Sequence, residues 1–282
     1  MLSSMRVVVV TSQKGGSGKT TLSGHLAVQA ELSGYAPVAL IDTDPQGSLA
    51  AWWNARASET PVFVQTSVQR LFYDLEALRA QGIRLVVIDT PPAVTGTIRS
   101  VVAFADLVVI PTRPSPHDLR AVGATLDIVE GKGKPLVFVV NGATPRARIT
   151  SEAAIALSQH GTVAPTTVHH RNDFASSMID GRTVCEIEPD GRSALEIKEL
   201  WDYVAQRLSK VQPRPVAQPQ GLDRPVFGHR HEVAPAAPAT QAAPAAEPAS
   251  AATPIEPAAP VLATAAAIVP NPAAGFGRRI SA

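Results

Sequence analysis

Short apolar runs, separated by longer amphipathic segments, follow one another along residues 5–210. Most of these runs are rich in Val and Ile and show no alternation with polar residues, which is typical of strands covered on both faces in a parallel sheet. We therefore predict strands at residues 5–11, 38–41, 62–65, 84–89, 107–110, 136–140 and 163–168.

The segments between the runs carry apolar residues at helical spacing. Ser67 and Ser115 are placed to cap two of the helices, and Gly34 suits the end of the first. The predicted helices cover residues 20–34, 48–57, the stretch after Ser67, 116–130, from Thr150 or Ser151 to about His160, a short piece after Phe174, and 194–208. In the last helix we expect an inward face of Leu195, Leu200, Trp201, Val204 and Leu208. This alternation predicts an α/β fold with a doubly wound, mostly parallel sheet and right-handed crossovers.

Composition divides the chain in two. About half of the 25 prolines lie beyond residue 211, in a segment dominated by Ala and Pro with few aromatic residues. Such a segment cannot bury enough apolar surface to offset the entropy of ordering it. We therefore predict one folded domain at residues 5–210 and a disordered Ala/Pro-rich tail at residues 211–282.

Charge and cysteine content exclude several classes of protein. The formal net charge is +1, so any contact with nucleic acid must come from a local patch. The single cysteine, Cys185, excludes a disulfide framework, and we expect it to be a small core or edge residue. We find neither a signal peptide at the start nor an apolar run of about eighteen residues, so we expect a cytoplasmic protein.

A glycine-rich stretch between the first strand and the first helix predicts a phosphate-binding loop. Backbone N–H groups of such a loop surround an anion, and the helix N-terminus adds its positive dipole end. Lys19 can reach the terminal phosphates, Thr20 can give its hydroxyl to Mg²⁺, and Thr21 can reach the α-phosphate. The generic loop pattern has Gly where this chain has Gln13. The predicted loop consists of Lys14, Gly15, Gly16, Ser17, Gly18, Lys19, Thr20 and Thr21.

Carboxylates follow two of the other predicted strands. Asp42 and Asp44 come directly after one strand, and Asp89 ends another, before a switch-like Thr-Pro-Pro turn. Because ligands of open α/β sheets bind at the carboxyl ends of the strands, these side chains are expected beside the phosphate loop. Asp89, at the end of a Walker B strand, is predicted to hold Mg²⁺ through a water.

The loop has a lysine at its entrance, Lys14, in addition to Lys19, and this feature indicates a family. The stretch from Lys14 to Thr20 resembles the deviant Walker loop of the ParA/MinD class of P-loop ATPases, and the chain is similar to the short, ParF-like branch over residues 5–210. The resemblance implies an ATPase with slow intrinsic turnover, using ATP and Mg²⁺. It implies that Lys14 reaches across a sandwich dimer to the partner's ATP, making dimerisation depend on ATP.

The same resemblance assigns further residues. Asp44 would orient the attacking water, and Asp42 would support the metal side. Asn141, after an apolar strand, would read the adenine edge, with backbone groups around Pro165 completing that pocket. Arg171 falls where the family carries a DNA-contacting arginine. Its possible companions are Arg182, Arg192, Lys198, Arg207 and Lys210.

The family function would be to form an ATP-bound dimer on nucleoid DNA, without sequence specificity, and to partition or position a cargo. A ParB-like or other partner would stimulate hydrolysis, and the cargo could be a plasmid, a chromosome or a large protein assembly. Only four residues precede the first strand, so we expect no helix-turn-helix extension. Two alternatives stay open: a MinD-like membrane-surface ATPase recruiting a division or secretion factor, and a P-loop kinase. No amphipathic terminal helix is evident, so no membrane partner is expected.

Overall fold

The computed structural model describes residues 5–92 and 95–212. Nearly all of the predicted tail, residues 211–282, lies outside the described residues, so the boundary near residue 210 stays a prediction.

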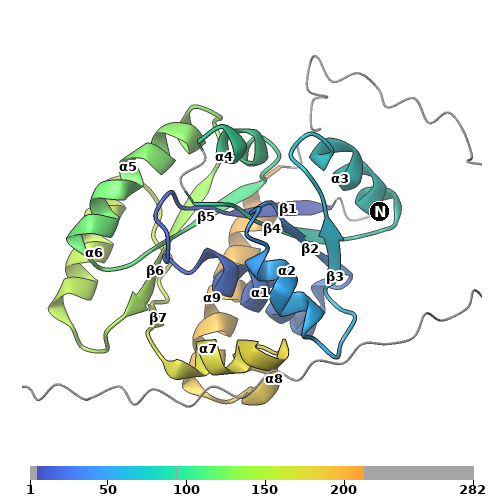
Figure 1. Ribbon diagram of the computed structural model, residues 1–282. Helices are drawn as coiled ribbons and strands as arrows, with labels where there is room; N and C mark the ends of the chain where they lie inside the picture. The colour runs from blue at the N-terminus through green and yellow to red at the C-terminus, as the bar shows by residue number, and fades with distance from the viewer. Residues whose placement is uncertain (1–4, 93–94, 213–282) are drawn as a thin grey trace, which may run out of the picture. The chain divides into compact units, whose positions relative to one another are not determined.

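A parallel sheet forms the centre of the described part (Figure 1). Its seven strands lie in the order β3-β2-β4-β1-β5-β6-β7, and every neighbouring pair is parallel. This arrangement confirms the predicted doubly wound α/β fold. The strands are β1 (Arg6–Val10), β2 (Val38–Asp42), β3 (Val62–Gln65), β4 (Leu85–Asp89), β5 (Leu107–Thr112), β6 (Leu136–Ala143) and β7 (Val168–His169).

Helices cover both faces of the sheet, giving three layers (Figure 1). The buried side chains of α1, α2 and α9 pack with Val8, Val10 and Leu40 on one face. Those of α3, α4 and α5 pack with Val7, Val9 and Ile41 on the other, as expected for strands whose side chains alternate. The α-helices are α1 (Lys19–Ala30), α2 (Ser48–Asn54), α3 (Leu71–Ala80), α4 (Thr95–Val102), α5 (Pro116–Glu130), α6 (Arg148–Ser158), α7 (Asn172–Ser177), α8 (Val184–Ile187) and α9 (Arg192–Lys210). A π-helical turn, Glu31–Tyr35, extends α1, and a 3₁₀ turn, Met178–Asp180, follows α7.

Some helix boundaries differ from the sequence prediction. Helix α5 begins and ends as predicted, and the Ser115 hydroxyl accepts the N–H of Asp118 at 3.1 Å. Ser67, in contrast, does not cap α3, which begins at Leu71 with no side-chain cap. Helix α6 begins at Arg148, before the predicted Thr150 or Ser151.

Other elements correct the prediction more strongly. Helices α4 and α8 were not expected. The predicted strand at 163–168 is reduced to Val168–His169 and a single bridge at Val163, because Pro165 between them has no N–H for a continuous ladder. On α9, Leu195 is 44% exposed, and Ile197 occupies the inward position instead. Cys185 is buried, as expected.

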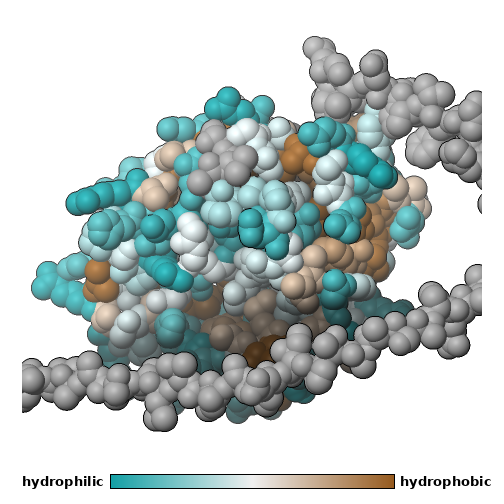
Figure 2. Space-filling view, viewed as in Figure 1, coloured by the Kyte–Doolittle hydropathy of each residue, from teal (hydrophilic) through white to brown (hydrophobic). Residues whose placement is uncertain are grey.

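The surface of the described part is mainly hydrophilic on the side that Figure 2 shows, with separate hydrophobic spots. Its most exposed large apolar side chains are Ile179, Ile155 and Leu32, which come from three different elements. None of the described helices has the length and apolar character that crossing a bilayer requires.

Candidate nucleotide-binding site

The strand order brings the predicted site residues to one edge of the sheet. Strand β4 lies between β1 and β2, with Asp89 opposite both Val10 and Asp42 in the two ladders. Thr43 fixes this edge further, because its hydroxyl donates to the Asp89 carbonyl at 2.7 Å. The loop after β1 and the carboxylates that end β2 and β4 therefore lie beside one another, as the sequence predicted.

The loop between β1 and α1 needs glycine at particular positions. Gly16 and Gly18 have φ angles of +74° and +94°, the left-handed conformation that side chains disfavour. A Cβ on Gly18 would also lie 2.2 Å from the Asn141 amide nitrogen. That nitrogen donates to the Ser17 carbonyl at 2.7 Å, so Asn141 holds the loop in shape. Its predicted contact with adenine stays a prediction.

Thr20 and Asp89 supply paired oxygen atoms for a cation. The Thr20 hydroxyl donates to an Asp89 carboxylate oxygen at 2.6 Å. Asp89 is 1% exposed, and this burial raises the pKa of its carboxyl to about 7, although the hydrogen bond from Thr20 lowers it. Mg²⁺ prefers oxygen ligands of this kind, so the donor set fits the predicted metal.

Lys19 lies buried at the start of α1 with 6% of its surface exposed. Burial lowers the pKa of its ammonium, and the carboxylates of Asp89 and Asp44 oppose that shift. No ion pair joins Lys19 to any residue in the described ranges. A buried cation without a bonded counter-ion is the group that a phosphate would complement.

The Asp42 carboxylate accepts hydrogen bonds from three backbone N–H groups. One of its oxygens accepts the N–H of Asp44 at 2.9 Å, and the other accepts those of Leu49 and Ala50 at 3.1 and 3.2 Å. Leu49 and Ala50 lie in the first turn of α2, so the Asp42 carboxylate stabilises the N-terminus of that helix. Its burial raises the pKa of the Asp42 carboxyl. The role of Asp42 in supporting the metal stays a prediction. Its observed contacts fix the backbone at Asp44 relative to α2.

An open cleft of about 700 Å³ runs along the phosphate loop, with Lys19 and Thr20 in its lining. Asp44 lines it, with one carboxylate oxygen accepting the N–H of Gln46 at 3.0 Å. The lining also includes Arg113, to which the sequence analysis assigned no role. The residues around the cleft are Gly15, Gly16, Gly18, Lys19, Thr20, Thr21, Asp44, Ser48, Ala51, Trp52, Ala55, Pro92, Arg113, Met178 and Ile179.

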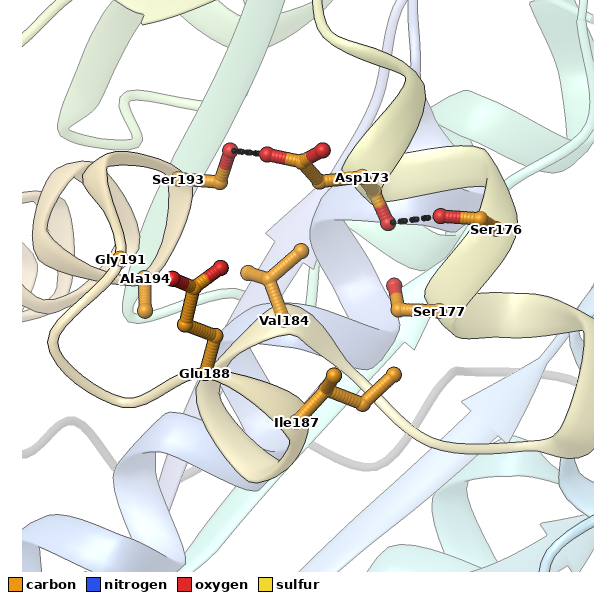
Figure 3. A pocket seen from close by; sticks show the side chains of 9 residues that line it. All are labelled: Asp173, Ser176, Ser177, Val184, Ile187, Glu188, Gly191, Ser193 and Ala194. Atoms are coloured by element: carbon orange, nitrogen blue, oxygen red, sulfur yellow. Dashed lines mark hydrogen bonds between the residues drawn. The ribbon is translucent and has the colours of Figure 1, made fainter.

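A second hollow, of about 110 Å³, lies between α7, α8 and α9 and does not suit a nucleotide (Figure 3). Its charged lining residues are the acidic Asp173 and Glu188. The Ser193 hydroxyl donates to the Asp173 carboxylate at 2.7 Å, so part of its polar lining is already paired. Its smaller size and acidic lining make it a poorer fit for an anionic ligand than the cleft of about 700 Å³.

Lys14 stands at the entrance of the loop with its side chain exposed. Its backbone N–H donates to the Ser12 hydroxyl at 3.3 Å, which fixes the start of the loop. Its ammonium has no ion pair within residues 5–92 and 95–212. The predicted reach of Lys14 to the nucleotide of a second copy stays a prediction.

Arg171 is not in the lining of the 700 Å³ cleft, and its guanidinium is paired. Its two terminal nitrogens donate to the two oxygens of Glu196, each at 2.7 Å. His169 also contacts Glu196, through Nδ1 at 2.7 Å. Glu196 lies on α9, 27 residues from His169, so no local sequence pattern indicates this contact. Among the proposed companions of Arg171, Arg182 pairs with Asp180.

Comparisons with known proteins agree with this geometry. The sequence model of the CobQ/CobB/MinD/ParA nucleotide binding domain matches residues 8–184. Maintenance of carboxysome distribution protein A of Halothiobacillus neapolitanus is 31% identical over 212 residues, covering 70% of this chain and 95% of that protein. The chromosome-partitioning ATPase Soj of Thermus thermophilus is 27% identical, covering 73% of this chain and 98% of its own. The ATP complex of a Cyanothece McdA variant superposes with a TM-score of 0.61 at 17% identity, over 76% of this chain and 100% of that one. The chain belongs to the CobQ/CobB/MinD/ParA nucleotide-binding family and, within it, to the ParA/MinD class of P-loop ATPases.

Proposed function

We propose that this ATPase forms an ATP-dependent sandwich dimer that binds DNA without sequence specificity and positions a large cargo. The observation that carries the proposal is the exposed side chain of Lys14, which directly precedes the cleft residues Gly15 and Gly16 and forms no ion pair with any described residue. An exposed lysine in this place is suited to a nucleotide held by a second copy.

The proposed chemistry is phosphoryl transfer to water. Such a reaction requires positioning and charge stabilisation more than covalent participation by the protein. Lys19 and the loop amides bind the phosphates, while Thr20 and Asp89 hold Mg²⁺, which neutralises charge on the phosphate oxygens when bound. Asp44, at the cleft wall, orients the attacking water.

The Asp44 loop connects this chemistry to the rest of the subunit. Asp42 holds both the Asp44 backbone and the first turn of α2. A displacement of Asp44 after hydrolysis is therefore transmitted to α2. This connection gives the ATP and ADP states a structural basis for different surfaces, as switching ATPases require.

The names of the relatives support the proposed role in positioning. One is a carboxysome distribution protein matched over 95% of its length, and another is a chromosome-partitioning ATPase. Both names describe the placement of an object much larger than the ATPase. We infer a cargo of this class, either a large protein assembly or a DNA molecule, and an activating partner protein that accelerates hydrolysis.

Parallel sedimentation with DNA and with lipid vesicles tests the proposal. Plasmid DNA and vesicles of anionic phospholipid are each mixed with the full chain and ATP, ADP or no nucleotide. We expect the protein to sediment with DNA only when ATP is present. Lys19→Ala, which removes the phosphate contact, should abolish this DNA binding. Binding to vesicles without binding to DNA would favour the MinD-like alternative. Phosphorylation of a small molecule by a single subunit would favour the kinase.

A further inference from the structure

Arg113 lies beside the phosphate loop in a position set by the fold. Thr112, the residue before it, ends β5 opposite Val140 of β6, so Arg113 stands next to Asn141 at the sheet edge. Pro114 follows and restricts the Arg113 backbone to extended conformations. The Arg113 carbonyl accepts the N–H of Ser115, the cap of α5, at 2.8 Å. The backbone at Arg113 is thus fixed from both sides.

The side chain of Arg113 extends from β5 toward the loop. Its Cγ lies 3.7 Å from the position that a Cβ on Gly142 would occupy. Its two terminal nitrogens lie 3.3 and 3.6 Å from the corresponding position on Gly16. The guanidinium therefore rests against the loop at a position where the absence of a side chain leaves room for it.

The charge of Arg113 has no counter-ion in the described part of the chain. Arg56, Arg171 and Arg182 each pair with a carboxylate, whereas no hydrogen bond or ion pair engages the Arg113 guanidinium within those residues. Arg113 is also exposed to solvent at the cleft wall. A planar guanidinium in this position can donate two parallel hydrogen bonds to phosphate oxygens.

We propose that Arg113 binds the triphosphate as a third cation of the site, in addition to Lys14 and Lys19. The inference deepens the proposed function and rests on ATP binding at this cleft. The phosphate can belong to the nucleotide of the same subunit or to that of a second copy seated against the cleft. The guanidinium chemistry is the same in both cases, and the two sources are separable by experiment.

The experiment compares Arg113→Met, which keeps the packing of the stem against Gly142, with Arg113→Lys, which keeps the charge. Arg120→Met, an exposed arginine of α5 that does not line the cleft, is the matched control. Affinities for fluorescent ATP and ADP analogues are measured at protein concentrations too low for dimerisation. Dimerisation and ATP turnover are then measured at high concentration. Thermal unfolding of each variant confirms that the fold is intact.

The two sources predict different results. If Arg113 acts on its own subunit's nucleotide, Arg113→Met weakens single-subunit ATP binding roughly 10- to 100-fold, as expected for losing a charged hydrogen bond, and Arg113→Lys restores part of it. If Arg113 acts on the nucleotide of a second copy, single-subunit affinity is unchanged, and Arg113→Met instead raises the ATP concentration needed for dimerisation by a similar factor.

The inference is overturned if Arg113→Met matches Arg120→Met in both affinity and dimerisation. A failure of the proposed function gives a different result, because the unmodified protein would then bind ATP without dimerising. In that case the single-subunit affinity alone decides the role of Arg113.

Discussion

The guanidinium of Arg56 and the carboxylate of Glu186 form an ion pair of 2.8 Å that joins the end of α2 to α8. Only 3% of the Arg56 side chain is exposed, and its cation also lies over the Trp52 ring at 5.0 Å. The Trp52 indole N–H donates to the Arg182 carbonyl at 3.2 Å. Helix α2, which begins just after the Asp44 loop, is therefore anchored at its far end to residues 181–186.

Removing this anchor should destabilise the fold. Arg56→Ala leaves Glu186 without its cation and uncovers the face of the Trp52 ring that the guanidinium covers. We therefore expect a loss of about 2–4 kcal/mol in the free energy of unfolding. Denaturant unfolding measures this loss. The control is Arg148→Ala, which breaks a pair with Glu152 whose partners are 90% and 52% exposed. That change should cost less than about 0.5 kcal/mol. Equal effects of the two substitutions would contradict the role of the anchor.

Gly18 should tolerate no side chain. Gly18→Ala places a Cβ where φ is +94° and where the Asn141 amide lies 2.2 Å away, so the loop must change shape. We expect nucleotide affinity to fall by at least about 100-fold, because several loop amides lose their alignment together. Isothermal titration with ATP and Mg²⁺ measures it. Gly123→Ala on α5, where a methyl meets open space, should keep the affinity of the unmodified protein.

His25 should make stability depend on pH. Its ring is fully buried, with Nδ1 2.8 Å from the Thr21 carbonyl and Nε2 accepting the Val184 N–H at 3.3 Å. Burial lowers the pKa of His25 from 6.5 to about 4, although the Thr21 hydrogen bond and the charge of Glu186 act the other way. The unfolded chain takes up this proton near pH 6.5 and the folded chain does not. The stability that depends on the neutral ring is therefore present above pH 6.5 and is lost as the pH falls toward 4.

Unfolding at pH 7.5 and pH 5.0 measures this effect. The His25 contribution should cost the unmodified protein about 2 kcal/mol between these two values. In His25→Asn, which keeps a donor near Nδ1, this part of the pH dependence should disappear. Asp89 shifts in the opposite direction in both proteins, so the difference between their profiles isolates His25. Identical profiles would show that the ring does not carry the effect.

The pairing of Arg171 with Glu196 gives the proposed DNA contact a specific test. Glu196→Gln should strengthen ATP-dependent DNA binding a few-fold, because it removes the charge that competes with phosphate for the guanidinium. Arg171→Ala should weaken DNA binding and reduce the slope of log affinity against log salt by about 1. Arg79→Ala, which breaks a pair with Glu76 on α3, serves as a control. If both changes at the Arg171 pair weaken DNA binding equally, the pair is structural and does not contact DNA.

The sequence predicted most strands because their apolar runs are continuous and buried on both faces. Helix α4 was missed because Thr95, Gly96 and Thr97 disfavour a helix, and tertiary packing of Ile98 and the two valines at its end compensates. Helix α8 is too short to show periodicity. The capping box that Thr183 forms with Glu186 is nevertheless visible as a Thr-x-x-Glu pattern, and could have revealed it.

The candidate site was predictable where its residues are contiguous. The loop from Lys14 to Thr21 lies in one stretch, and strand-end carboxylates share an edge in any parallel sheet. Contacts between distant segments, such as Asn141 with Ser17 or Arg113 with Gly16, depend on the strand order, which no local pattern encodes. The same limit applies to Arg171, whose partner Glu196 is 25 residues away on another element.

The role of Lys14 is tested most directly by the mass of the protein in solution with nucleotide. Sedimentation of Asp44→Ala, which should bind ATP without hydrolysing it, is compared with that of the double variant Lys14→Ala/Asp44→Ala. We predict a dimer for the first with ATP and a monomer with ADP. The second should stay a monomer with ATP while still binding it. A monomer in every condition, or a dimer that forms equally well without Lys14, would contradict the account.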